Sequence, residues 1–411
     1  MKNEVTMGVL AGIIVLVAGA ASAQQGGAPS TLSDDDTGQG TIVRGALEAG
    51  VNYTDNAYYT NEAGDPQNAT GFLLKPELSV SRILPRFRLT AGANAEFGTF
   101  DLPDDQDDYT DYQLALGANW LSALRHNWTF ASALREDHDP FGTERTENTP
   151  LATRELDQWR ETSGNIGYRY GMPTDRYNID FVVLALNRSY TNNRADTQYL
   201  DYESAGAQLS AYYNVTPKSA LFAVVIGSRS VYETVEPGFF DRGATEMRYG
   251  VGGKWKASAK TTGDVRLGYV DRKRRDSDED SFTSFDWTAS LAWTPRSYRS
   301  FDLQTGRASQ ESYLNNVEFI NNRFVNLSWT EQWTQLLQSN LGVRFLDSEF
   351  VGSTRKDQAS ILSLNIQYRA MRNLTLLANA SSNMVDSEAS FDSSFAEYDR
   401  FYGYLGVRYS R

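Results

Sequence analysis

The chain has 411 residues, with 39 Lys and Arg against 52 Asp and Glu, a formal net charge of -13 and no cysteine. The acidic balance argues against a nucleic-acid-binding protein, which needs a basic surface. The lack of cysteine excludes disulfides and thiolate metal sites, so stability must come from backbone hydrogen bonds and packing.

The first segment has the pattern of a secretory signal peptide. Lys2 precedes an apolar run from Val9 to Ala21, and Ala21-Ser22-Ala23 supplies small residues for cleavage before Gln24. The apolar run is too short for a membrane span. We therefore predict a signal peptide over residues 1–23. The next residues, 24–40, are rich in Gly, Ser, Gln and Asp and are predicted to be a flexible periplasmic leader.

Residues 41–411 repeat one unit, a pair of strands with alternating apolar and polar residues. The clearest pair is Ile361–Arg369 followed by Leu374–Ser381, where apolar residues recur at every second position. No stretch after the signal approaches 18 consecutive apolar residues, so no transmembrane helix is expected. A membrane-spanning barrel remains possible, because its strands alternate apolar and polar residues and need no continuous apolar run.

Short turns and long polar loops alternate along this region. The expected tight turns are Leu84-Pro85-Arg86, Leu124-Arg125-His126-Asn127, Met172-Pro173-Thr174-Asp175, Thr216-Pro217-Lys218, Ser258-Ala259-Lys260, Thr294-Pro295-Arg296, Glu331-Gln332 and Met371-Arg372. The expected long loops are Thr54–Ala69, Asp101–Asp108, His138–Thr153, Thr191–Thr197, Glu233–Arg242, Arg275–Asp280, Ser312–Glu318, Gly352–Lys356 and Ser387–Phe395.

This pattern predicts an all-β fold over residues 41–411. It is a transmembrane antiparallel up-and-down β-barrel of about 18 strands, with short periplasmic turns and longer extracellular loops. A soluble sandwich also has alternating strands, but it needs Greek-key crossings between two sheets. Nine successive hairpins favour the closed barrel, and we expect the protein in the outer membrane.

The tryptophans gather close to the expected tight turns. Amphipathic rings favour the membrane interface, so this placement predicts a periplasmic aromatic girdle. Its residues are Trp120, Trp128, Trp255, Trp293, Trp329 and Trp333.

The polar faces of the strands are expected to line an aqueous lumen. A charge on the lipid side would cost about 2–4 kcal/mol near the midplane. Arginine and tyrosine together suit acidic or hydroxylated solutes, although these residues could instead pair across strands and fill the wall. The predicted lumen residues are Arg88, Glu96, Arg169, Arg248, Lys254, Arg266, Arg344, Arg369, Arg400, Tyr402, Tyr404 and Arg408.

Little in the chain points to catalysis. The two histidines, His126 and His138, have no catalytic motif around them, although Asp137 and Asp139 flank His138. We therefore expect no enzyme activity, no cofactor and no metal site. The acidic loops are interpreted as solvated, with cation bridging to lipopolysaccharide phosphates as the alternative.

Three segments carry a family resemblance: Val51-Asn52-Tyr53-Thr54-Asp55-Asn56, Leu74-Lys75-Pro76-Glu77-Leu78 and the last strand, Tyr402–Tyr409. The barrel resembles a family of outer-membrane β-barrel porins associated with exopolysaccharide export. The resemblance implies a conduit through which a polymer leaves the cell with a periplasmic export partner. The chain ends Tyr409-Ser410-Arg411, which displaces by two residues the terminal aromatic that the barrel-assembly machinery reads in many such barrels.

The leading expectation is a passive outer-membrane pore for export of an extracellular or capsular polysaccharide. The alternatives are a general diffusion porin for small hydrophilic solutes and a structural or adhesion barrel. The expected partners are outer-membrane lipid, lipopolysaccharide, a periplasmic polysaccharide-export protein and the barrel-assembly machinery.

Overall fold

The computed structural model of the protein describes residues 40–61, 64–102, 108–147, 155–172, 174–276, 281–314, 316–388 and 397–411. The predicted signal peptide and the leader up to Gln39 lie outside the described residues. The sequence from Gly40 onward forms strands of 13 to 16 residues. A tilted strand needs only about 9–11 residues to cross a bilayer, so each strand is long enough to span it.

Eighteen strands make up the fold. Their bounds are β1 (Gly40–Thr54), β2 (Ala69–Leu84), β3 (Phe87–Phe100), β4 (Tyr109–Ala123), β5 (His126–Asp139), β6 (Asp157–Tyr170), β7 (Tyr177–Tyr190), β8 (Tyr202–Thr216), β9 (Ser219–Tyr232), β10 (Ala244–Ser258), β11 (Thr261–Arg274), β12 (Ser281–Arg296), β13 (Arg299–Glu311), β14 (Phe319–Gln332), β15 (Leu337–Val351), β16 (Lys356–Met371), β17 (Leu374–Glu388) and β18 (Tyr398–Ser410).

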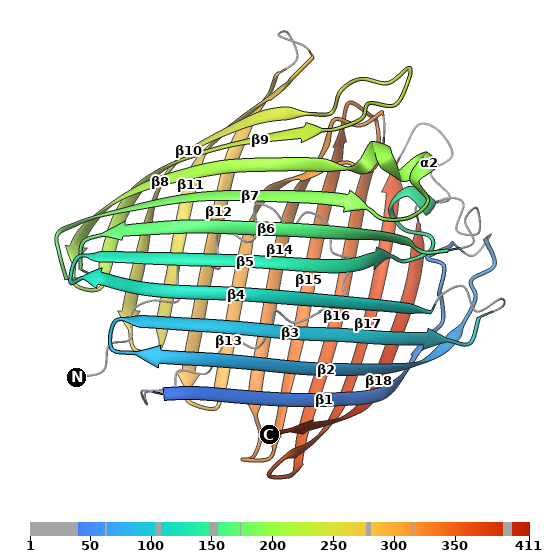
Figure 1. The fold of residues 1–411 in the computed structure, drawn as a ribbon, viewed down its shortest axis with the longest axis horizontal. Helices are drawn as coiled ribbons and strands as arrows, with labels where there is room; N and C mark the ends of the chain where they lie inside the picture. The colour runs from blue at the N-terminus through green and yellow to red at the C-terminus, as the bar shows by residue number, and fades with distance from the viewer. Residues whose placement is uncertain are drawn as a thin grey trace.

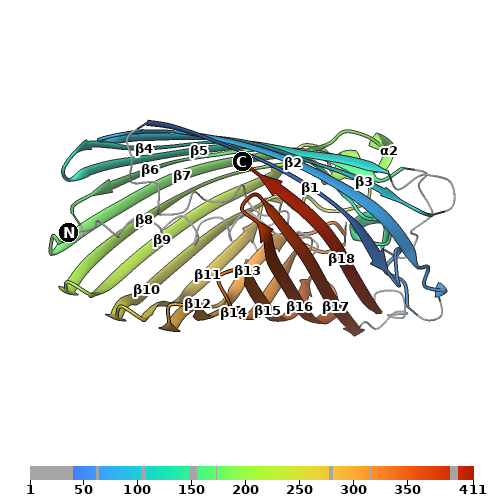
Figure 2. The same cartoon turned by 90° about the horizontal axis from the view of Figure 1, so that it is seen from below.

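The strands close into one ring. Each strand pairs antiparallel with its neighbours in sequence, and β1 pairs with β18 from Ala46↔Ser410 to Thr54↔Tyr402. The predicted up-and-down barrel of 18 strands is therefore confirmed. Tight turns lie at one end, while α2 (Arg194–Thr197) and the longer connections lie at the other (Figures 1 and 2).

Three short helical segments lie in the described parts of the connections. They are η2 (Glu144–Thr146), α2 and η3 (Gln198–Leu200). Among the described residues, no helix is long and apolar enough to cross a membrane.

Two predicted turns lie too early in the sequence. Strand β12 continues through Pro295 to Arg296, because a register shift against β13 between Trp293 and Arg296 accommodates the proline. Strand β14 continues to Gln332, whose N–H donates to Tyr298 O at 2.8 Å and extends the ladder. The connections that follow are residues 297–298 and 333–336.

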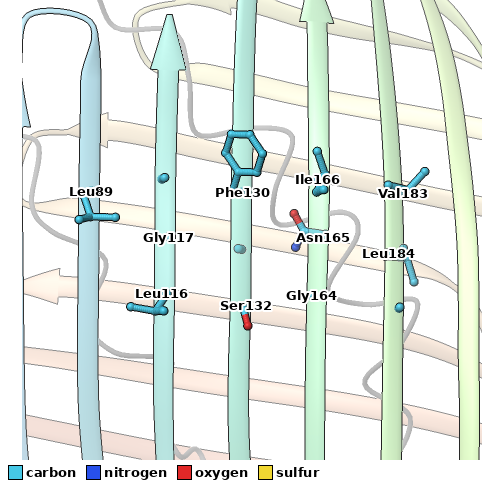
Figure 3. A pocket seen from close by; sticks show the side chains of 13 residues that line it. Leu89, Leu116, Gly117, Phe130, Ser132, Gly164, Asn165, Ile166, Val183 and Leu184 are labelled. Atoms are coloured by element: carbon cyan, nitrogen blue, oxygen red, sulfur yellow. The ribbon is translucent and has the colours of Figure 1, made fainter.

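The two faces of the wall differ in polarity. Apolar side chains project outward and stay exposed, such as Leu116 at 59% and Leu405 at 63%. An apolar groove of about 550 Å³ crosses the outer face from β3 to β7, between Leu116, Phe130 and Ile166 and over the small residue Gly164 (Figure 3). An outer surface of this kind suits contact with acyl chains.

We expect Leu364→Arg to destabilise the barrel by about 2–4 kcal/mol, because Leu364 lies on the outward face near the middle of β16. Gln367→Arg on the inward face of the same strand is the control and should cost much less. The free energy of unfolding by urea in lipid vesicles measures both. Equal losses would contradict the assignment of the two faces.

Candidate functional site: a lumen covered by a loop bridge

Residues 140–147, which follow β5, reach across the mouth of the barrel. Glu147 accepts hydrogen bonds from Arg355 Nη1 at 2.8 Å and from the Tyr313 hydroxyl at 3.1 Å. Arg355 lies between β15 and β16, and β6 and β15 are nine positions apart in a ring of 18 strands. The contact therefore joins loops from opposite walls across the lumen. We call the contact among Glu147, Arg355 and Tyr313 the mouth bridge.

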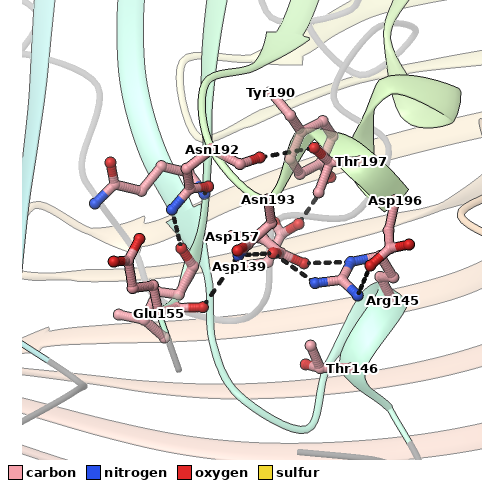
Figure 4. A network of polar contacts seen from close by, with 12 residues as sticks. Asp139, Arg145, Thr146, Glu155, Asp157, Tyr190, Asn192, Asn193, Asp196 and Thr197 are labelled. Atoms are coloured by element: carbon pink, nitrogen blue, oxygen red, sulfur yellow. Dashed lines mark hydrogen bonds and ion pairs between the residues drawn. The ribbon is translucent and has the colours of Figure 1, made fainter. Parts of the chain in front are cut away.

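The near side of this connection is anchored to the loop after β7. Arg145 donates to both carboxylate oxygens of Asp157 at 2.8 and 2.7 Å, and Asn193 Nδ2 donates to Asp157 at 2.7 Å (Figure 4). Burial disfavours the charge on Arg145, but its hydrogen bonds to Asp157 and the charges of Asp157 and Asp196 together outweigh burial and raise the pKa of the guanidinium. Asp157 is 2% exposed, so this pair holds the loop firmly against the wall.

The loop between β1 and β2 supports the same segment. Gly142 has a φ of +79°, and a Cβ there would lie 1.7 Å from the Tyr58 carbonyl oxygen. Only glycine fits this conformation and this close approach. The neighbouring Phe141 is buried and meets the Tyr58 ring edge-on, with 6.3 Å between the centroids. Phe141 also belongs to an apolar cluster with Leu73 and Tyr109, on the inner wall.

Arg242 ties three further connections together at the mouth. Its Nη1 donates to Ser312 O at 2.6 Å, and its Nη2 donates to Tyr199 O. The guanidinium lies 4.3 Å from the centroid of the Tyr232 ring and is largely buried. The connections after β7, β9 and β13 are therefore held as one unit.

We call residues 140–147, which the contacts above hold against the wall, the docked loop. Its stability should depend on pH through Glu144. Burial, and then the charge of nearby Asp139, raises the pKa of the Glu144 carboxyl, while Arg188 opposes the shift. A raised carboxyl pKa means that docking favours the protonated form. The docked loop therefore loses stability as pH rises from the ordinary glutamate pKa to the raised value.

We expect single-channel conductance to increase with pH over that window. Glu144→Gln should flatten the increase, because the amide stays neutral at every pH. Conductance recorded in planar bilayers between pH 4 and pH 8 tests this. An unchanged pH profile in the variant would rule out Glu144 as the responsible group.

The register places all of the predicted lumen residues on the inward face. Several are neutralised by acids. Arg248 donates to Glu246 at 2.7 Å and to Asp286 at 2.6 Å, and Arg266 donates to Asp286 at 2.8 Å. Arg169 forms a bidentate pair with Asp180, with both bonds at 2.6 Å. These residues brace the wall, as the alternative interpretation of the sequence allowed.

A second group lies along β18 and the strands beside it. Arg408 pairs with Glu77 and Glu48, and the Tyr404 hydroxyl donates to Glu48 at 2.8 Å. Arg400 donates to Thr54 Oγ1 at 3.0 Å. The two remaining predicted residues of this wall are Glu96, which pairs with Lys75 at 2.8 Å, and Tyr402, which packs on the cluster around Leu73.

Three predicted arginines form neither an ion pair nor a side-chain hydrogen bond within the described chain: Arg88, Arg344 and Arg369. Lys254 forms no ion pair with the described residues, and its Nζ lies 3.9 Å from the centroid of the Tyr212 ring. Their contact with a transported solute stays a prediction.

The six predicted girdle tryptophans lie near the tight turns. Five occupy outward positions of strands, and Trp333 lies in the connection after β14. Phe301 stacks between Trp293 and Trp329 at centroid distances of 5.2 and 6.2 Å. Their role at the membrane interface stays a prediction.

No local sequence pattern predicts the mouth bridge. Glu147 and Arg355 are 208 residues apart, and each lies in a polar loop that resembles the others. Only the closure of the ring brings them together.

Similarity to a known family agrees with the architecture. A family model described as Putative beta-barrel porin 2 matches residues 38–411. The chain is similar to the solved FrpB iron transporter from Neisseria meningitidis, with 10% identity and a TM-score of 0.49, over 85% of this chain and 64% of that one. It thus spans less than two thirds of that structure. OccAB3 from Acinetobacter baumannii shows 9% identity and a TM-score of 0.45, over 90% and 99% of the two chains. No curated protein matches.

Proposed function

The chain belongs to the Putative beta-barrel porin 2 family and is an outer-membrane barrel, and from this premise we propose that it exports an extracellular or capsular polysaccharide. The observation that carries the proposal is the set of inward arginines whose side chains form neither an ion pair nor a hydrogen bond in the described chain, Arg88, Arg344 and Arg369. Their guanidinium groups are available for forked hydrogen bonds to carboxylate and hydroxyl groups of a sugar polymer.

The position of these arginines favours entry from the tight-turn end. Arg88 is the second residue of β3 after a tight turn, and Arg369 lies two residues before the end of β16 at another. Arg344 lies halfway along β15. An acidic polymer that enters from the periplasm would meet two free cations first and a third at mid-depth. A periplasmic export protein would dock at this end.

Aromatic side chains on the inner wall provide the second type of contact. Tyr212 and Tyr402 face inward. Ring faces pack on the apolar faces of sugar rings while hydroxyl groups hydrogen-bond beside them. One inward carboxylate, Asp302, also has no ion pair in the described chain, so recognition does not depend on charge alone.

The covered mouth fits a conduit that opens only for its cargo. The mouth bridge closes the outlet at rest and limits leakage of small solutes. A polymer pushed from the periplasm would displace the bridge from below. The chain needs no energy source of its own for this motion.

The test is secretion of the polymer by a strain that lacks the gene and carries either the wild-type protein or the Arg88→Gln, Arg344→Gln, Arg369→Gln triple variant. We expect the deletion to abolish secreted polymer and the triple variant to restore only a small part of it. The matched control is Arg82→Gln, an exposed arginine on the outward face of β2. Normal secretion in the deletion strain would reject the export role.

A general diffusion porin is the alternative, favoured by the alternating acid and base pairs along the wall, such as Arg169 with Asp180. Liposome swelling with small neutral sugars separates the two functions. Rapid swelling, together with normal polymer secretion in the deletion strain, would support the general porin. A barrel that conducts no ions at any pH would leave a structural or adhesion role.

A further inference from the structure

Strands β4 and β5 separate before they reach the mouth. Their pairing ends at Tyr112↔Glu136. Beyond that point Asp111 pairs with Glu96 of β3, and His138 pairs with Gln158 of β6. The two strands therefore diverge toward the mouth, and side chains fill the gap between them, which we call the notch.

Three metal-ligating side chains converge in this notch. One ligand atom from each of Asp111, Asp137 and His138 lies within 4.8 Å of the others. His138 Nδ1 is 3.0 Å from Asp111 Oδ1 and 3.8 Å from Asp137 Oδ1. Ligands to one ion at about 2.0–2.2 Å lie roughly 3 Å apart, so small rotations bring all three atoms to a common ion.

The imidazole is held in place by its surroundings. The His138 side chain is only 7% exposed, and its ring lies 4.1 Å from the Tyr109 ring, centroid to centroid. The Tyr109 hydroxyl donates to Glu96 at 2.7 Å, which fixes the stacking ring. Arg135 pairs with Asp137 and also lies 5.1 Å from the Trp159 centroid, so it keeps a second contact if an ion takes the carboxylate.

We propose that Asp111, Asp137 and His138 bind a divalent transition-metal ion that joins β4 to β5 where their backbone pairing stops. One imidazole nitrogen with two carboxylate oxygens suits Zn²⁺, Mn²⁺ or Fe²⁺, whereas Ca²⁺ and Mg²⁺ prefer oxygen ligands alone. The ion replaces the proton on Nδ1, which is released to solvent. The site is independent of the polymer proposed for the lumen.

The geometry also permits a simpler state, a hydrogen bond between His138 and Asp111 with no ion. Binding of Zn²⁺ to the full-length protein separates the two. The protein is purified in detergent, stripped with a chelator, and titrated with Zn²⁺ by calorimetry. We expect one Zn²⁺ per chain, a rise in the unfolding temperature on binding, and release of protons.

His138→Gln and Asp111→Asn, made separately, should each weaken Zn²⁺ binding by about tenfold or more. The matched control is His126→Gln. This other histidine contacts the Tyr168 hydroxyl at 2.7 Å next to a tight turn, with no acidic ligand beside it, and its variant should bind Zn²⁺ as the wild type does. Resistance of the barrel to detergent denaturation reports that each variant is folded.

Several results would overturn the site. They are a wild-type protein that binds no Zn²⁺ in stoichiometric amount, a folded His138→Gln or Asp111→Asn variant with unchanged affinity, and equal affinity for Mg²⁺ and Zn²⁺. The first of these results is obtained with the wild-type protein, so the test does not depend on whether a variant folds.

Discussion

Replacing Arg355 by Ala is expected to open the mouth of the barrel and to raise the single-channel conductance severalfold. Arg355 and Glu147 have side chains only 12% and 15% exposed, and Arg355 also donates to Asp357 at 2.6 Å. Removing one partner of a buried ion pair typically costs about 3–5 kcal/mol. Since about 1.4 kcal/mol is tenfold in a population, the ratio of closed to open mouths should fall about a hundredfold or more.

The matched control for this experiment is Arg323→Ala. Arg323 also pairs with two acids, Asp347 and Glu349, but its side chain is 47% exposed and its partners lie on the neighbouring strand β15. Its loss should leave the conductance unchanged. If Arg355→Ala conducts as the wild type does, the mouth bridge does not control access to the lumen.

The largest loss of stability is expected for Arg248→Met. Arg248 is the cation between Glu246 and Asp286, and all three side chains are at most 6% exposed. It also donates to Ser309 at 2.9 Å. Without Arg248, Glu246 keeps only Arg272 at 3.6 Å and Asp286 keeps Arg266 at 2.8 Å, so each buried carboxylate loses a cation and we expect a loss of about 3–5 kcal/mol in the free energy of unfolding. Urea titration in lipid vesicles measures it.

A combined variant distinguishes the lost charge pair from lost packing. Arg248→Met with Glu246→Gln removes one cation and one carboxylate and leaves Asp286 paired with Arg266, so we expect it to recover much of the stability. Arg160→Met is the control, because Arg160 pairs with Glu136 on the exposed outer face and should matter little. A single variant as stable as the wild type would mean that the buried cluster is not held together by Arg248.

The alternation of residues was enough to predict the barrel. In β16, Leu362 and Leu364 alternate with Ser363 and Asn365, and this period of two determines which side faces lipid. The alternation of turns and loops then determined the strand number and the up-and-down order. The predicted turn position is wrong where a bulge carries a proline, as at Pro295, because a local register shift has no clear sequence pattern.

The tertiary structure decided what the inward and loop residues contact. The sequence placed Arg248 and Arg344 on the same face, but only the fold shows one arginine between two carboxylates and the other without an acidic partner in the described chain. It also brings Glu147 to Arg355 across the mouth, and His138 to Asp111 in a notch between strands. Strand periodicity is a local property of the chain, whereas these contacts depend on ring closure, on stagger between strands and on loop paths that join distant residues.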